Sequence, residues 1–325
     1  MNNIKILGSG YAKPLKTITN YDLEKKVDTS HEWIVQRTGI TQRYISENEN
    51  TSDLGYRAAL AAIKDAEMEA NDIDAIIVAT MTPDHLTPST ACLIQEKLGL
   101  NHKQIFAVDL NAACSGFLYA FQIACSLLER FEKILIIGSE TLSKIIDWQD
   151  RSTCVLFGDG AGAMIITKGN SHVYHYADSE GDNQNVLIAK GLSLTKDLTH
   201  PIQSPIYLSM QGQEVFRFAV RVMQESIEKV LQLSGLSIDD IDLIIPHQAN
   251  YRIISHVAKK MKVDISKFYI NISEFANTSS ATIPIAFGDA KEKGFIHENS
   301  KIIMVGFGGG LTYGATLIDG GQLCY

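Results

Sequence analysis

Cys114 stands where the hydrophobic pattern of the chain changes, in the stretch DLNAACSGFLYA at residues 109–120. The apolar residues before it are typical of a strand, and residues 116–131 have the spacing of a buried helix. A thiol at the start of a helix lies near free backbone N–H groups and the positive end of the helix dipole, which favour its ionisation. The position is compatible with an ionisable nucleophile, although composition alone favours an ordinary buried cysteine.

Two other polar turns carry groups that could work with this thiol. His247 follows an apolar run in IIPHQANYR (244–252), at the carboxyl edge of a predicted strand, where α/β proteins place their sites. Asn277 lies in EFANTSSATIP (274–284), and its amide can donate to an anionic oxygen. Taken singly, a core histidine and a helix N-cap asparagine remain the alternatives.

The elements that would position these groups form a repeat. Strings of the type Asp-Ile-Asp occur at 72–74 and 240–242, and similar Lys-led apolar runs begin at 133 and 301, so both pairs are 168 positions apart. NAACSGFLYAF (111–121) and NTSSATIPIAF (277–287) lie 166 apart. Three collinear pairs predict a duplicated unit with halves at 1–168 and 169–325, whose equivalent turns meet at the interface between the halves.

Strand-like runs at 73–80, 104–110, 133–140, 241–247 and 301–307 alternate with helical stretches, which predicts an α/β fold with buried sheets. One helix is expected over 51–66, with Thr51, Ser52 and Asp53 able to cap its start. The glycine-rich segments at 158–166 and 306–315 do not lead from a strand into a helix, so they do not fit a dinucleotide-binding fingerprint.

Composition excludes several classes of function. The 325 residues carry a net charge of -8, which argues against general nucleic-acid binding. Five cysteines without CxxC spacing fit neither a disulfide framework nor a zinc site, and the nine histidines show no metal-binding pattern. No secretory signal or membrane-spanning run of about 18 apolar residues is present. We expect a cytoplasmic, soluble protein without a metal.

Several motifs in this order resemble the β-ketoacyl-acyl-carrier-protein synthase III family of the thiolase superfamily. They are DTSHEWIVQRTGI, AACSGF, GDGAGA, PHQAN, NTSSA and GFGGGLTYGA, and the resemblance runs from about residue 4 to residue 318. It implies a thiolase-like fold of two pseudo-repeated α/β halves in five α-β-α-β-α layers. It also implies a homodimer and a Cys–His–Asn triad formed by Cys114, His247 and Asn277.

The family's reaction is a decarboxylating condensation that initiates fatty-acid synthesis without a cofactor, since the acyl-CoA thioester is a substrate. The resemblance implies transfer of the acyl group to Cys114, with the oxyanion held by the N–H groups of Cys114 and Gly309. Malonyl-acyl carrier protein then loses carbon dioxide, and His247 and Asn277 stabilise the enolate. A relative in secondary metabolism with another acyl donor or acceptor, and a non-catalytic acyl-binding homologue, are the alternatives.

The resemblance also assigns binding positions. The CoA-binding residues would be Trp33 and Arg151 around the adenine and Arg37, Gly212, Phe216, Ala249 and Asn250 along the tunnel. Arg252, Lys259 and Lys260 fall on one helical face, together with His256, and would dock the acidic carrier protein. The sequence departs from the family where Leu86 and Thr87 replace a bulky phenylalanine of the acyl pocket, and where Ala276 replaces a glycine before the triad asparagine.

Overall fold

The computed structural model describes residues 3–182, 184–191 and 207–320, so Cys324 lies outside the described residues. The strands are β1 (Asn3–Ala12), β2 (Lys16–Thr19), β3 (Gln42–Ile45), β4 (Ala75–Ala79), β5 (Phe106–Leu110), β6 (Ile134–Glu140), β7 (Gly160–Lys168), β8 (Ser171–Ser179), β9 (Leu187–Ala189), β10 (Leu208–Met210), β11 (Leu243–Pro246), β12 (Lys301–Gly308) and β13 (Thr312–Asp319). The α-helices are α1 (Asn20–Glu24), α2 (His31–Thr38), α3 (Thr51–Asp65), α4 (Thr90–Lys97), α5 (Gly116–Leu127), α6 (Arg151–Cys154), α7 (Gly212–Ser234), α8 (Tyr251–Met261), α9 (Ile272–Phe275) and α10 (Thr282–Glu292).

Nine strands follow one another in the order β11-β12-β13-β8-β1-β7-β6-β4-β5. The pairing between β1 and β8 involves only two residue pairs, Asn3 with His172 and Ile4 with Ser171. This short junction separates a sheet built from β1 and β4 to β7 from a sheet built from β8 and β11 to β13. Each sheet combines parallel and antiparallel pairs.

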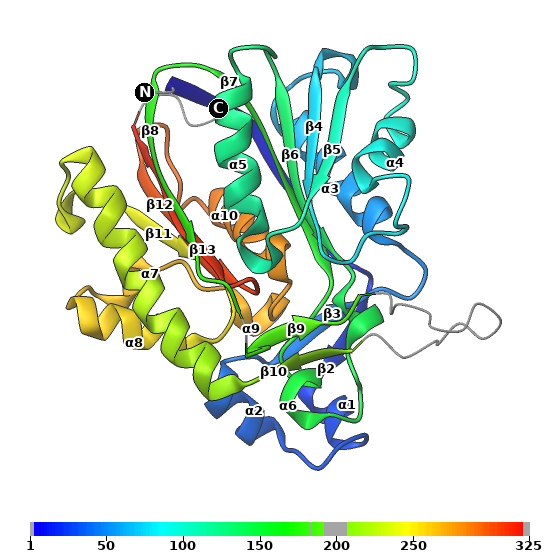
Figure 1. Cartoon of the computed structure of the whole chain (residues 1–325), viewed down its shortest axis with the longest axis vertical. Helices are drawn as coiled ribbons and strands as arrows, with labels where there is room; N and C mark the ends of the chain where they lie inside the picture. The colour runs from blue at the N-terminus through cyan, green and yellow to red at the C-terminus, as the bar shows by residue number, and fades with distance from the viewer. Residues whose placement is uncertain (1–2, 183, 192–206, 321–325) are drawn as a thin grey trace.

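Helices cover both sheets in five layers (Figure 1). The helices α5 and α10 lie between the sheets, where Phe117, Phe121 and Phe287 pack against the inward-facing residues of both. The outer face of the first sheet is covered by α3 and α4, and that of the second by α7 and α8. Because each sheet is buried on both faces, its strands are continuous apolar runs, as the sequence indicates.

The two sheets are built in the same way down to individual side chains. Lys103 donates to the carbonyl oxygens of Asn71 and Ile73 at 2.8 and 2.7 Å. Lys267 donates in the same manner to the oxygens of Asp239 and Ile241 at 3.2 and 2.8 Å, and these acceptors lie 168 positions further along the chain. The fold class predicted from the sequence is confirmed. The proposed boundary between residues 168 and 169 falls in the turn from β7 to β8.

The predicted strands are present, and their ends differ from the predicted ends by at most two residues. Of the three residues predicted to cap the helix over 51–66, only Asp53 takes part in the cap. The N-cap of α3 is Asn50, and Asp53 completes its capping box from the third helical position. Thr51 instead turns inward, where its hydroxyl bonds to the oxygen of Thr82 and to the hydroxyl of Thr141.

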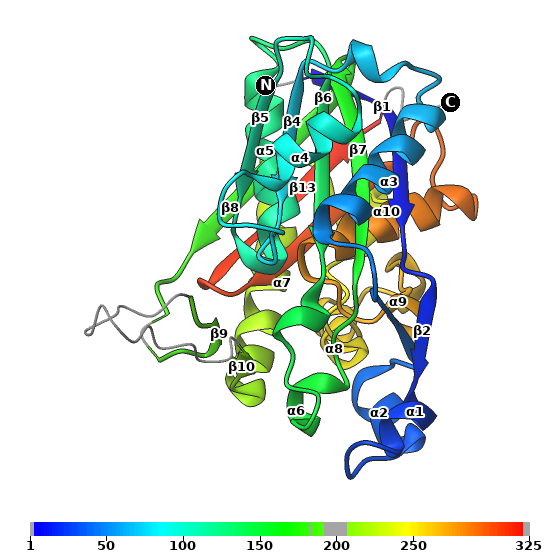
Figure 2. The same ribbon diagram turned by 90° about the vertical axis from the view of Figure 1, so that its right-hand side faces the viewer.

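The short elements gather at one end of the molecule (Figure 2). The pairs β2–β3 and β9–β10 lie there with α1, α2 and α6, beyond the ends of the long strands. No helix among the described residues combines the length and apolar character that crossing a bilayer requires.

Gly138 of β6 shows how tightly the two halves meet. A Cβ atom at this position would lie 2.4 Å from the carbonyl oxygen of Ser280, in the second half. Gly138→Ala should therefore lower the free energy of unfolding by about 1–3 kcal/mol, as overpacking of a close contact does. Gly181→Ala is the matched control, since no atom lies within 4 Å of its added Cβ. Equal urea midpoints for the two variants would contradict this account.

Candidate active site

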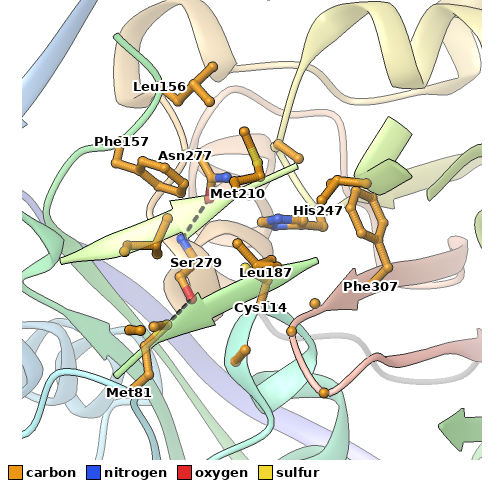
Figure 3. A pocket seen from close by; sticks show the side chains of 18 of the residues that line it. Met81, Cys114, Leu156, Phe157, Leu187, Met210, His247, Asn277, Ser279 and Phe307 are labelled. Atoms are coloured by element: carbon orange, nitrogen blue, oxygen red, sulfur yellow. Dashed lines mark hydrogen bonds between the residues drawn. The ribbon is translucent and has the colours of Figure 1, made fainter. Parts of the chain in front are cut away.

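A cavity of about 450 Å³ opens between the two halves. Cys114 lines it from the first half, and His247, Asn277 and Gly309 line it from the second. Leu187 to Ala189 and Met210, from β9 and β10, form part of its apolar wall. The structure thus brings the three predicted groups to one space, and their side chains point into it (Figure 3).

The turn at Cys114 is formed by close packing of backbone on backbone. Ala113 to Ser115 make a single 3-10 turn that leads directly into α5. Gly308 of β12 passes against it, and a Cβ atom there would lie only 2.6 Å from the nitrogen of Cys114. Only glycine permits this approach, which keeps the thiol at the edge of the cavity beside Gly309.

The thiol itself is more deeply buried than the sequence suggested. Cys114 is 7% exposed, and burial raises the pKa of its thiol to about 12. A hydrogen bond with Ser279 opposes this rise, and the buried carboxyl of Glu140 adds to it. Cys114 lines the cavity, as the sequence indicates, but the expected ease of ionisation is not met, because loss of hydration outweighs the turn's favourable dipoles.

His247 follows β11 and is 1% exposed. Burial lowers the pKa of its imidazole to about 3, so the ring is neutral near pH 7. The edge of Phe307 contacts the ring, with centroids 5.3 Å apart and an interplanar angle of 75°. The Nδ1 atom lies 2.6 Å from the hydroxyl oxygen of Thr282, at the start of α10. The ring is thus held from two sides.

Asn277 is oriented by its own turn. Its Oδ1 atom accepts the backbone N–H of Ser279 at 2.9 Å, so the amide oxygen is occupied. The Nδ2 group is then the end of the amide that remains to donate into the cavity. Asn111, in the equivalent turn of the first half, accepts the N–H of Ala113 at 3.0 Å in the same way. The two turns are therefore structural counterparts, with Cys114 at the place of Ser280.

Both turns depend on unusual backbone angles. Ala113 and Ser279 occupy equivalent places and have φ of 45° and 50°. Ala276, which precedes Asn277, has φ 58° and ψ -158°, a conformation that glycine adopts more easily. Alanine at this position is therefore strained, and its side chain is fully buried.

Glu140 at the end of β6 was missed in the sequence, because nothing in GSET distinguishes a buried carboxyl from a surface one. It is fully buried and accepts hydrogen bonds from the hydroxyls of Thr82 and Ser280 at 2.6 and 2.7 Å. Burial raises the pKa of this carboxyl despite these donors. Glu140 therefore connects the end of β4 in the first half to the turn that carries Asn277.

The predicted CoA-binding residues fall into two groups. Gly212, Phe216, Ala249 and Asn250 line the cavity. Trp33, Arg37 and Arg151 lie outside its lining, where the Arg151 guanidinium is 4.9 Å from the Trp33 ring centre and that of Arg37 is 5.9 Å away. Arg151 and Trp33 are in direct contact, so a planar group can enter between them only if Arg151 moves.

The basic helix is formed as predicted. In α8, Arg252, His256, Lys259 and Lys260 are exposed, whereas Ile253, Ile254, Val257 and Ala258 are buried. The cavity wall continues into this helix through Asn250, whose side chain caps its start. A carrier-protein surface here remains a prediction.

Leu86 and Thr87 do not line the cavity of the single chain. Both are exposed, Leu86 by 80%. The apolar wall is made instead by Met81, Leu142, Leu156 and Phe157 of the same chain. A role of Leu86 and Thr87 in an acyl pocket would require a second copy of the chain and stays a prediction. Within the described parts of the chain, no three His, Cys, Asp or Glu side chains are grouped as metal ligands.

Comparison with known proteins agrees with this architecture. Residues 108–194 match the family described as 3-oxoacyl-[acyl-carrier-protein] synthase III, and residues 231–319 match its C-terminal domain. The chain is 48% identical over 323 residues to β-ketoacyl-[acyl-carrier-protein] synthase III of Clostridium acetobutylicum, covering 98% of this chain and 99% of the relative.

Solved structures give the same result. The 3-oxoacyl-[acyl-carrier-protein] synthase III of Aquifex aeolicus superposes with a TM-score of 0.90 at 42% identity, over 98% of this chain and 100% of the other. The priming β-ketosynthase of the R1128 polyketide pathway has the same TM-score at 30% identity, over 100% and 98% of the two chains. The resemblance noted in the motifs is confirmed, and the chain belongs to the β-ketoacyl-acyl-carrier-protein synthase III family.

Proposed function

We propose that this chain catalyses the decarboxylating condensation of an acyl-CoA primer with malonyl-acyl carrier protein, which initiates fatty-acid synthesis. The observation that carries the proposal is the single cavity that receives a thiol, a neutral imidazole and the free donor end of an amide. These groups suit a reaction that needs one nucleophile and two hydrogen-bond donors. All steps use groups of the chain and its substrates, so the proposal includes no cofactor.

In the first step the Cys114 sulfur attacks the carbonyl carbon of the acyl-CoA thioester. The backbone N–H groups of Cys114 and Gly309 stabilise the tetrahedral oxyanion, and the carbon–sulfur bond to CoA then breaks. The proton of the thiol leaves with the CoA sulfur, so neutral thiol and thioester become neutral thioester and thiol. A Cys114 thiol that is neutral before reaction is compatible with this exchange.

In the second step malonyl-acyl carrier protein loses carbon dioxide, and negative charge develops on its thioester oxygen. Donors from His247 and Asn277 would stabilise this enolate, each contributing about 3 kcal/mol in the dry cavity. The enolate carbon attacks the acyl thioester and forms the 3-oxoacyl product. The Cys114 sulfur leaves as a thiolate and takes up one proton from solvent.

Substrate binding would use the residues that the family resemblance assigns. The adenine end of CoA would enter between Trp33 and Arg151, next to Arg37, and the pantetheine arm would follow Gly212, Phe216, Ala249 and Asn250. The exposed cations Arg252, Lys259 and Lys260 would receive the acidic carrier protein. We further propose a cytoplasmic homodimer, in which a partner's Leu86 and Thr87 would close the acyl pocket.

A second candidate is a priming condensation in secondary metabolism. The likeness to the R1128 priming β-ketosynthase favours it, since that enzyme shares the fold and 30% of its residues with this chain. Comparing malonyl-loaded carrier proteins from fatty-acid and polyketide systems as acceptors distinguishes the two. A non-catalytic acyl-binding role would leave the intact triad without a use.

The first test is intact-protein mass after mixing with short, branched and medium acyl-CoAs. Wild type should gain the mass of one acyl group, whereas Cys114→Ala should gain none because the nucleophile is absent. The acyl-CoA that labels Cys114 most completely identifies the primer. No adduct with any donor of the panel would overturn the proposed function.

Asn277→Ala should separate the two steps. Decarboxylation of malonyl-acyl carrier protein should slow by about 10²- to 10³-fold, since one donor to the enolate is lost. Acylation of Cys114 uses other donors, so its rate should change by less than about tenfold. Stopped-flow acylation and release of labelled carbon dioxide measure the two rates, and equal losses in both would contradict the assignment.

The pH dependence of alkylation tests the state of the thiol. Because burial raises the pKa of Cys114 to about 12, only a small fraction is thiolate at neutral pH. Its alkylation by iodoacetamide should rise about tenfold per pH unit from about pH 6 to about pH 9 without a plateau. Peptide mass spectrometry follows Cys114 separately from the exposed Cys92. A rate already constant at neutral pH would indicate a thiolate–imidazolium pair instead.

A further inference from the structure

The hydroxyl of Thr282 is the polar group in contact with the inner nitrogen of His247. The distance from Thr282 Oγ1 to His247 Nδ1 is 2.6 Å, and both side chains are buried. The same oxygen lies 3.0 Å from the carbonyl oxygen of Ser279. A hydroxyl carries one proton, so it donates to one of these two acceptors at a time.

The surroundings favour donation to the histidine. The carbonyl oxygen of Ser279 can accept the hydroxyl, but it also accepts the backbone N–H of Thr282 and so keeps a donor when the hydroxyl turns to Nδ1. Nδ1 has no comparable second donor among the contacts of the described residues, and its distance to the hydroxyl is the shorter one. Donation to Ser279 would force Nδ1 to carry the ring proton and leave Nε2 bare.

We propose that Thr282 is a positioning residue that holds His247 in the tautomer with its proton on Nε2. In this tautomer Nδ1 accepts from Thr282, and the Nε2–H group is free to donate toward the cavity. The other tautomer would present a lone pair to an enolate oxygen, which repels rather than stabilises it. The inference rests on the proposed function, because it explains how a neutral imidazole acts as a donor.

Nearby hydroxyls do not replace Thr282. Ser280 Oγ lies 2.9 Å from the oxygen of Ala79 and 2.7 Å from Glu140. Ser279 Oγ contacts the sulfur of Met81 at 3.6 Å. Thr278 Oγ1 is buried and has no hydrogen-bond partner among the described residues. The tautomer therefore depends on one side chain, and Thr278 supplies a matched control in the same turn.

The test compares Thr282→Val, Thr282→Ser and Thr278→Val with wild type. Thr282→Val keeps the shape and removes the donor, so decarboxylation of malonyl-acyl carrier protein should slow by about 10²-fold, the scale of a lost oxyanion donor. Thr282→Ser should restore most of the rate, and Thr278→Val should match wild type. Acylation of Cys114 by acyl-CoA should continue in all four proteins, which shows that each variant is folded.

Nitrogen-15 NMR of histidine-labelled protein measures the tautomer of His247 directly. A purely structural role of Thr282 would leave this tautomer unchanged. In wild type the His247 signals, assigned by their loss in His247→Ala, should show a protonated Nε2 and a bare Nδ1. Thr282→Val should move part of the population to the opposite tautomer. Wild-type rates and an unchanged tautomer in Thr282→Val would overturn the inference and leave the proposed function intact. Absence of acylation in wild type would instead overturn the proposed function itself.

Discussion

The structure depends on a close meeting of two backbone turns, one from each half, between two buried sheets. Gly138 and Gly308 have no side chain at the points where β6 and β12 press against these turns. Glu140 fixes the contact chemically, because a buried carboxyl needs hydrogen-bond donors and draws them from both halves. Moving the turn that carries Ser280 would take one donor from this carboxyl and leave it the donors of the first half, Thr82 among them. The cavity and its three polar groups are therefore consequences of how the halves pack.

The repeat explains why a nucleophile and a donor arise at neighbouring places. Asn111 and Asn277 make the same hydrogen bond within their turns, so the same local backbone structure occurs once in each half. In the first half the residue three positions after the asparagine is Cys114, whereas in the second half it is Ser280, which bonds to Glu140. The two turns therefore share a backbone and present different side chains to the cavity, Cys114 from the first and Asn277 from the second. Divergence of side chains on a shared backbone was sufficient to give the two turns different roles.

Much of this could be predicted from the sequence, for identifiable reasons. Buried strands are continuous apolar runs, so the fold could be predicted from the sequence. Matching residues such as Asp74 and Asp242 lie 166 to 168 positions apart, so the two equivalent turns could be predicted as well. The protonation state of Cys114 could not be predicted, because the cavity that surrounds it is lined in part by β9 and β10, which are distant in the chain. Glu140 and Thr282 were missed because their partners lie 58 to 140 and 35 positions away. Contact between Trp33 and Arg151 likewise depends on tertiary packing.

Burial of Cys114 and His247 favours the neutral forms of both side chains. A thiolate–imidazolium pair would have to be formed in an apolar cavity, where desolvation of two ions offsets much of their attraction. Thioester exchange does not need that pair, since it converts one neutral thiol and thioester into another. In the second step the reacting group brings its charge as a carboxylate; neutral carbon dioxide leaves, and the negative charge stays on the enolate. A cavity that offers donors rather than fixed charges therefore suits a reaction in which negative charge appears only transiently, on the tetrahedral oxyanion and on the enolate.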